Sequence, residues 1–207
     1  MKDKLNIKIN CHSSICINDN IYIDPYKIED EPHNASVIFI THPHYDHLDL
    51  ESIKKVLGKD SVIVCTASSA EVLDGKVTCP LYIVWPNKKG EVKGIKYSTF
   101  PAYNVGHHHF KELGFVGFVL EIDGKKYTIC GDTDATKELE QIKTEILLIP
   151  IGGTYTMNAK EAANLTNIIK PKVVVPTHYN TIVGSKKDEQ EFIRNLSKDI
   201  EVLILVK

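Results

Sequence analysis

An apolar run that leads into a histidine-rich loop decides the fold: from Val37 to His47 the chain reads VIFITHPHYDH. The run VIFI has no polar alternation, so it predicts a strand covered on both faces. In an extended loop, positions 42, 44 and 46 project to one side and position 47 to the other. A turn after His44 would separate one pair of ligands from a second, so the loop could bind two adjacent cations. Imidazoles and a carboxylate suit zinc, manganese or iron.

Two later strand ends carry similar chemistry. GDTD follows the apolar run KKYTIC and contains Asp132, whose two carboxylate oxygens could bridge two metals, while Asp134 is expected to cap the following helix. PTHY follows KVVVP and supplies His178 as a further ligand from a third strand. One more imidazole is needed, and His107-His108-His109 offers three candidates among which spacing does not choose.

The rest of the chain alternates β-branched runs with amphipathic segments, a pattern that predicts two packed sheets with helices outside. Asp123-Gly124 predicts a hairpin of type I′, and Asn18-Asp19-Asn20 predicts another turn. Asn158 and Glu161 resemble a capping box. The predicted strands cover 5–9, 21–24, 37–40, 62–65, 81–85, 115–122, 125–130, 145–151, 172–176 and 201–206, and the predicted helices cover 49–57, 68–74, 158–169 and 187–197.

Composition sets broader limits. The chain has 207 residues, of which 43% are hydrophobic, and its formal charge is −2, so one compact domain over 1–207 is expected and nucleic acid is not indicated. The N-terminus lacks a signal-peptide core and no apolar run could span a membrane, which predicts a cytoplasmic protein. Five cysteines include no CxxC pair, so a disulfide framework is not expected, and Cys65 and Cys130 should be small buried side chains.

These motifs together resemble a known family. THPHYDH matches the HxHxDH motif of the metallo-β-lactamase superfamily, and GDTD and PTHY match its later metal motifs in the same order. The whole chain is similar to the small UPF0173 and L-ascorbate-6-phosphate lactonase-like branch of metal-dependent hydrolases. The resemblance implies an α/β fold, specifically a four-layer αββα sandwich with a dinuclear site at one edge.

The resemblance also implies roles for particular residues. It places His42, His44 and His109 on one metal, Asp46, His47 and His178 on the other, and Asp132 between them. His109 is preferred because the family's ligand precedes a segment like KELGFVGF by a fixed distance; His108 is the reserve. Residues implied or suggested as ligand-orienting groups or substrate contacts are Asp24, His12, Tyr155 and Tyr179.

The function implied is hydrolysis by a hydroxide that bridges two divalent ions, with zinc first and manganese or iron as alternatives. Asp46 and Asp132 are the catalytic candidates. The substrate expected is a small-molecule or lipid-like phosphoester, lactone or related ester or amide, and a homo-oligomer stays open. The alternatives are a non-catalytic metal-binding or regulatory module and, third, a di-iron redox protein, although a flavin domain and a carboxylate at the position of His44 are lacking.

Overall fold

The fold was analysed in a computed structural model that describes residues 5–106 and 108–206. The chain separates into two compact units, the first ending at Ile83 and the second beginning at Val84. None of the helices formed by the described residues combines the length and the apolar character needed to cross a bilayer.

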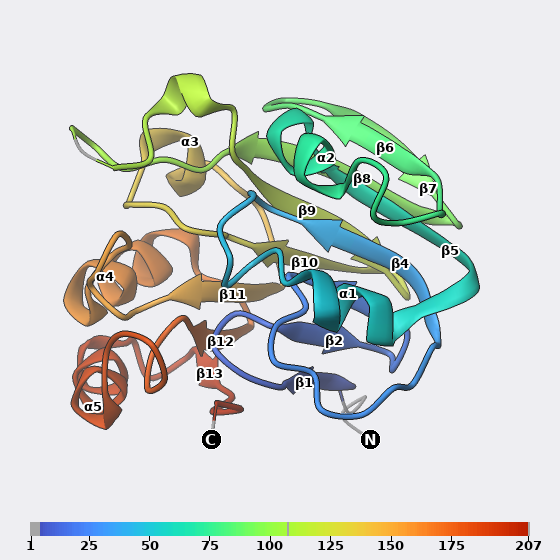
Figure 1. Cartoon of the computed structure of the whole chain (residues 1–207). Helices are drawn as coiled ribbons and strands as arrows, with labels where there is room; N and C mark the ends of the chain where they lie inside the picture. The colour runs from blue at the N-terminus through green and yellow to red at the C-terminus, as the bar shows by residue number, and fades with distance from the viewer. Residues whose placement is uncertain (1–4, 107, 207) are drawn as a thin grey trace. The chain divides into compact units, whose positions relative to one another are not determined.

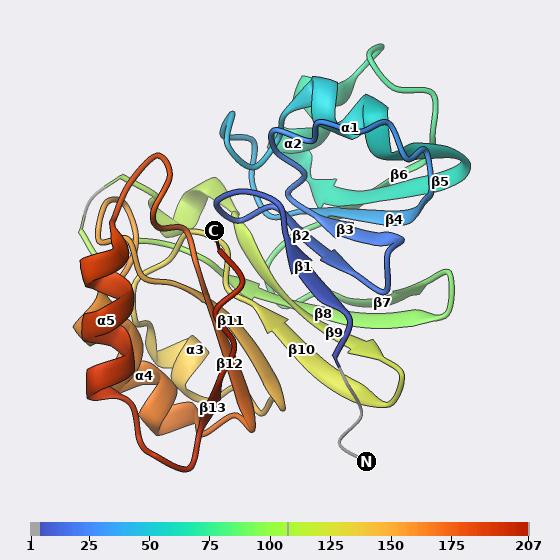
Figure 2. The ribbon, with the colours of Figure 1, turned by 90° about the horizontal axis from the view of Figure 1, so that it is seen from below.

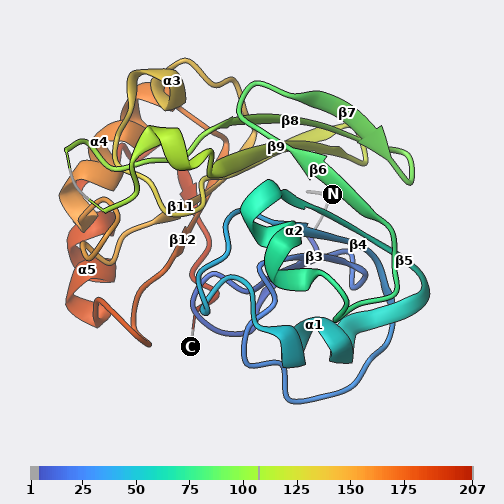
Figure 3. The ribbon, with the colours of Figure 1, turned by 45° about the horizontal axis from the view of Figure 1, so that its top comes forward.

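The first unit is built on a six-stranded sheet in the order β1-β2-β3-β4-β5-β6. Helices α1 and α2 lie on the same side of this sheet (Figures 1 and 3). The elements are β1 (Ile7–Ile9), β2 (Ile15–Ile17), β3 (Ile21–Ile23), β4 (Ala35–Ile40), α1 (Leu50–Val56), β5 (Leu57–Thr66), α2 (Ala67–Leu73) and β6 (Leu81–Val84).

The core of the first unit explains why VIFI lacks polar alternation. Ile38 and Ile40 of β4 belong to one buried cluster with Ile53 of α1 and Leu73 of α2. The alternate residues of β4 face the other way, and Phe39 is also fully buried. Strand β4 runs parallel to both β3 and β5, so its carboxyl end lies beside theirs. The loop after β4 therefore starts from a rigid, fully packed strand.

The second unit is built on a seven-stranded sheet in the order β13-β12-β11-β10-β9-β8-β7. Helices α3, α4 and α5 gather on one face of it (Figure 2). The elements are β7 (Lys89–Val92), β8 (Ile95–Pro101), a 3-10 turn (Lys111–Leu113), β9 (Val116–Ile122), β10 (Lys125–Ile129), α3 (Lys137–Glu140), β11 (Ile146–Pro150), α4 (Ala159–Ile169), β12 (Val173–Thr177), α5 (Lys186–Asn195) and β13 (Glu201–Val202).

Local signals in the sequence predicted several of these features. The hairpin between β9 and β10 turns through Asp123 and Gly124, which both have positive φ as a type I′ turn requires. The capping box at Asn158 and Glu161 is present, with Glu161 N–H donating to Asn158 and Asn158 N–H donating to Glu161. Cys65 and Cys130 are fully buried, as predicted.

Two expectations about the fold are wrong. The strand predicted over 201–206 pairs only at Glu201–Val202. Residues 172 and 174 accept hydrogen bonds from that strand, and Pro176, the next residue on this side of β12, has no N–H with which to continue the ladder. Asp134 does not cap α3, because Thr136 accepts from Leu139 N–H there and Asp134 binds the loop at residues 104–105 instead.

Candidate metal centre

Asp24 organises the half of the site that belongs to the first unit. It directly follows β3 and is 1% exposed. Its Oδ1 accepts from Thr41 N–H at 2.8 Å, and its Oδ2 accepts from the Thr41 hydroxyl at 2.7 Å and from His47 Nδ1 at 2.7 Å. Burial raises the pKa of the Asp24 carboxyl, while its contacts with His47 and Thr41 act in the opposite direction. One carboxyl group thus holds both ends of the loop after β4.

These hydrogen bonds fix which nitrogen of each histidine can bind a metal. A carboxylate only accepts, so His47 Nδ1 carries the proton and its Nε2 carries the lone pair. The Thr41 hydroxyl gives its one proton to Asp24, so it accepts from His42 Nδ1 at 2.9 Å, and His42 also presents Nε2 as a lone pair. Both rings are at most 1% exposed. The two imidazoles are therefore set in the tautomer that a metal ligand needs.

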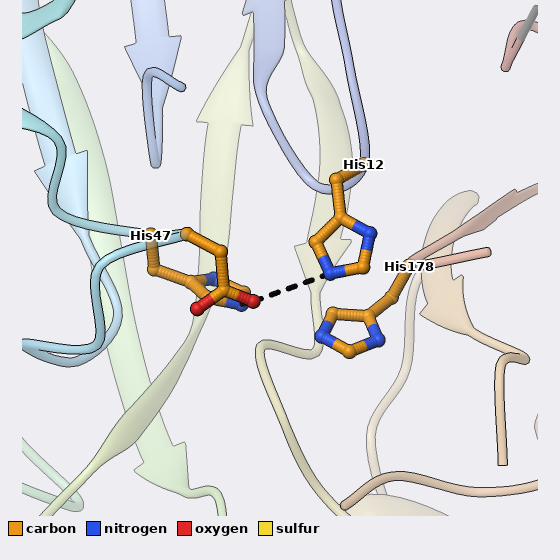
Figure 4. A group of neighbouring side chains, drawn as sticks. His12, His47 and His178 are labelled. Carbon is orange, nitrogen blue, oxygen red and sulfur yellow. Dashed lines mark ion pairs between the residues drawn. The ribbon is translucent and has the colours of Figure 1, made fainter. Parts of the chain in front are cut away.

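The other donors of this unit lie close to these two rings. The His44 and His42 rings meet edge to face with centroids 4.7 Å apart, and a ligand atom of each lies within 4.8 Å of the other. Asp46 Oδ2 is 3.7 Å from His47 Nε2. His12, which follows β1 and is fully buried, places its Nε2 3.3 Å from the same oxygen of Asp46. Figure 4 shows the His12 and His47 rings on separate loops, with the ion pair to His12 dashed.

The second unit supplies a carboxylate and an imidazole in contact. Asp132 follows β10 and His178 follows β12, strands that both run parallel to β11. The carboxyl ends of neighbouring parallel strands share one edge of a sheet, so these residues come together. His178 Nε2 lies 3.2 Å from Asp132 Oδ1, and both side chains are buried. His178, also labelled in Figure 4, has a positive φ of 56°.

Gly152 makes the backbone conformation at His178 feasible. A Cβ atom at position 152 would lie 2.2 Å from the His178 carbonyl oxygen, a distance that no side chain tolerates. The neighbouring Tyr179 is fully buried, and its hydroxyl donates to Glu189 of α5 at 2.5 Å. Tyr179 therefore anchors the loop to α5, and its buried ring favours a packing role over the predicted substrate contact.

Within the triple histidine, His109 and His108 differ in how far they are buried. His109 is 3% exposed, and its backbone is held by Asn104: His109 N–H donates to Asn104 Oδ1 at 3.2 Å, and Asn104 N–H donates to the His109 carbonyl at 2.8 Å. His108 is exposed and has a positive φ of 52°. His107 lies outside the described residues. The burial of His109 and its fixed loop favour it over His108 as a ligand.

Two residues that organise the site were not singled out from the sequence. The Thr41 hydroxyl is hydrogen-bonded to both Asp24 and His42, so it connects these two side chains. The Asn104 side chain is hydrogen-bonded to the His109 backbone, to Asp134 and to the Tyr155 carbonyl. Thr41 opens the histidine motif and Asn104 lies in PAYNVG, just ahead of the triple histidine, so position alone could have drawn attention to both. Their hydrogen-bond partners come from distant parts of the chain.

Comparison with known proteins identifies the fold. The chain is similar to the solved structure of a metallo hydrolase from Ignicoccus hospitalis, with a TM-score of 0.76 and 21% identity over 98% of this chain and 95% of that one. It is also similar to a metallo-β-lactamase fold protein from Bacillus subtilis, with a TM-score of 0.72 and 13% identity over 94% and 88% of the two chains. The α/β architecture with two sheets is therefore the metallo-β-lactamase fold, as the sequence motifs predicted.

Sequence comparison identifies the family. The model of the β-lactamase superfamily domain matches residues 7–178. A UPF0173 metal-dependent hydrolase from Thermococcus onnurineus is 32% identical over 89% of this chain and 88% of its own length. The chain belongs to the β-lactamase superfamily and, within it, to the UPF0173 metal-dependent hydrolases. The expectation of a metal-dependent hydrolase is confirmed at this level.

Proposed function

We propose that the donors of the two units complete one dinuclear centre within a single domain. His42, His44 and His109 would hold one ion, Asp46, His47 and His178 the other, and Asp132 would bridge them. The family model supports this proposal because its match extends over residues of both units. The observation that carries it is the tautomer of His42 and His47, because hydrogen bonds that lead to Asp24 hold the proton of each ring on Nδ1 and so place the lone pair on Nε2.

The donor set fits divalent ions of intermediate softness. Five imidazoles and two carboxylates suit zinc, and they also suit manganese or iron. When bound, such ions activate water at neutral pH and polarise a carbonyl or phosphoryl oxygen. We propose zinc as the first choice and two ions per chain.

The side chains of this protein would then position the reacting groups. Asp46 is held from one side by His12 at 3.3 Å, which fixes the direction of its carboxylate. A carboxylate so placed can hold a water molecule and accept its proton during attack on a carbonyl carbon or on phosphorus. The proposed reaction is hydrolysis of an ester, lactone, amide or phosphoester.

The decisive experiment is metal analysis combined with a substrate panel. The protein would be loaded with zinc, manganese or iron and assayed on phosphodiesters, lactones and acyl esters. We expect two equivalents of metal per chain, and we expect Asp132→Asn to lose both metal and hydrolysis. Asp123→Asn is the matched control, because asparagine also tolerates the positive φ of that hairpin position. Full hydrolytic activity of Asp132→Asn would contradict the proposal.

The same experiment separates the alternatives. Iron with a redox-active spectrum would indicate a di-iron redox protein, and tightly bound metal without turnover of any substrate would indicate a regulatory module. The cytoplasmic location and the oligomeric state stay predictions.

A further inference from the structure

A cavity of about 590 Å³ opens in the second unit, and His108, the chain neighbour of the proposed ligand His109, is part of its lining. Three loops form its wall: the loop after β8, with Val105 and His108; the turn with Asp134; and the loop after β11, with Tyr155. The centroid of the Tyr155 ring lies 6.3 Å from that of His109. The volume falls within the range of small-molecule sites. A substrate reacting next to His109 would have this cavity available for its non-reacting part.

The lining of the cavity is negatively charged. Asp134 and Glu161 contribute two carboxylates, and among the described residues that line it there is no lysine or arginine. The oxygens of Asp134 accept hydrogen bonds from two neutral groups, the Asn104 side-chain amide and Val105 N–H, both at 2.8 Å. Those hydrogen bonds fix the carboxylate in place without cancelling its charge.

The N-terminus of α4 opposes this charge but does not outweigh it. A helix N-terminus is equivalent to about half a positive charge. The capping box already uses this end: Glu161 N–H donates to the Asn158 side chain at 3.0 Å, and the Glu161 carboxylate is itself the anion placed there. Two carboxylates against about half a positive charge leave the cavity negative. An anionic group is therefore disfavoured at this position.

An aromatic surface completes the cavity. Tyr155 is 48% exposed and has a positive φ of 59°, a backbone conformation uncommon for a bulky side chain. Its ring meets the ring of His108 edge to face, with centroids 4.0 Å apart. Such outliers persist where the surrounding structure holds them, and they gather at ligand sites. Aromatic faces attract cations, and Tyr is among the rings that do so.

We propose that this cavity is a specificity pocket for a positively charged nitrogen, so that the preferred substrate is an ester, lactone or amide with an ammonium group in its non-reacting part. The ammonium group lies against the Tyr155 ring and is paired electrostatically with Asp134 and Glu161. The part of this inference that concerns hydrolysis rests on the proposed function. The binding preference of the cavity does not depend on metal.

The first test measures binding to the metal-free protein, so it is independent of catalysis. Choline and 3,3-dimethylbutan-1-ol have the same shape and differ in charge. In NMR titrations we expect choline to bind about tenfold more tightly, with shifts centred on Val105, Tyr155 and Glu161. Equal or weaker binding of choline, or shifts elsewhere, would overturn the proposal.

A charge-neutral variant sharpens this test. Glu161→Gln keeps the capping box, because glutamine also serves at this position, so the fold of α4 is retained. We expect the ratio of the two dissociation constants to fall at least threefold in this variant. Glu191→Gln on α5, which lies outside the cavity lining, is the matched control and should keep the wild-type ratio. An unchanged ratio in Glu161→Gln contradicts the assignment.

The second test uses the metal-loaded protein. Acetate esters of the same two alcohols differ only in the remote charge. We expect kcat/KM to favour the choline ester about tenfold, and Glu161→Gln to reduce this ratio. If neither ester is hydrolysed while choline still binds selectively, the hydrolytic function fails and the pocket stands. Hydrolysis of both esters at equal rates refutes the pocket and leaves the hydrolase intact.

Discussion

At the scale of single residues, Asp24 determines the protonation pattern of the loop after β4. It is the shared acceptor for Thr41 and His47, and through Thr41 it also sets the proton on His42. Removing its charge affects two proposed ligands at once. The consequence can be measured as metal affinity, separately from turnover.

We predict that Asp24→Asn lowers metal affinity by about 10-fold to 100-fold, the range typical of groups that orient metal ligands. An amide replaces one of the two carboxylate oxygens with an NH2 donor, so it cannot accept all three hydrogen bonds that Asp24 receives from Thr41 and His47. Affinity would be measured by competition with a chromophoric chelator. Asp60→Asn, an exposed carboxylate on β5, is the control. Equal affinity of the two variants would show that Asp24 does not orient the ligands.

Individual residues could be predicted from the sequence where a strand end or a motif marks them. Asp132 and His178 follow apolar runs, and the structure brings their side chains to 3.2 Å. The positions of Thr41 and Asn104 could have drawn attention to them, but what these two residues do could not be predicted. Their roles depend on partners far away in the chain, such as Asp24 for Thr41 and Asp134 for Asn104, and a hydroxyl or an amide has no fixed partner until the chain is folded.

At the scale of elements, the loops after β11 and β12 pack against each other without room for a side chain at position 152. We predict that Gly152→Ala destabilises the protein by about 1–3 kcal/mol, as overpacking does, and also weakens metal binding, because the obstructed atom is the carbonyl oxygen of His178. Chemical denaturation and chelator competition would measure the two effects.

Gly75→Ala provides the comparison for that variant. Position 75 has a positive φ and open space around it, so alanine there meets backbone strain of about 1 kcal/mol but no obstruction. Its metal affinity should equal that of the wild type. If Gly152→Ala loses stability but keeps full metal affinity, the close packing at position 152 stabilises the fold without determining how His178 binds metal.

Elements with local signals were predictable, and elements defined by their neighbours were not. Helix α4 has its capping box, and the β9–β10 hairpin has its Asp-Gly turn, so both follow from a few adjacent residues. The length of β13 depends on Pro176 in another strand. Strands β7 and β8 were missed because their exposed positions are polar and because they form by pairing, β7 with β8 and β8 with β9.

At the scale of the whole molecule, the buried Cys65 thiol should make the free energy of unfolding fall as the pH rises into the alkaline range. Burial raises the pKa of the Cys65 thiol from 9.0 to about 12. The unfolded chain therefore releases this proton from about pH 9, whereas the folded chain keeps it until about pH 12, so stability falls as pH rises through that window. We predict a falling melting temperature between pH 9 and 12 and a shallower fall in Cys65→Ala. Identical slopes in circular dichroism melts would contradict this.

Metal binding should also link the two units, because the proposed centre takes ligands from both. An ion at 100 times its dissociation constant stabilises the folded state by about 2.7 kcal/mol, which for a chain of this size corresponds to roughly 5–10 °C in melting temperature. We predict a loss of that size for each ion removed by a chelator, and its recovery when zinc is added back.

Hydrogen exchange can show whether this stabilisation belongs to one centre or to two separate sites. If one centre spans both units, chelation should speed amide exchange in residues 41–47 and also in residues 177–179. Asp132→Asn, a change in the second unit alone, should then raise exchange in residues 41–47 when metal is limiting. Asp123→Asn should leave both segments unchanged. Faster exchange confined to the second unit in Asp132→Asn would mean that each unit binds metal on its own, because a shared ion cannot be lost by one unit and kept by the other.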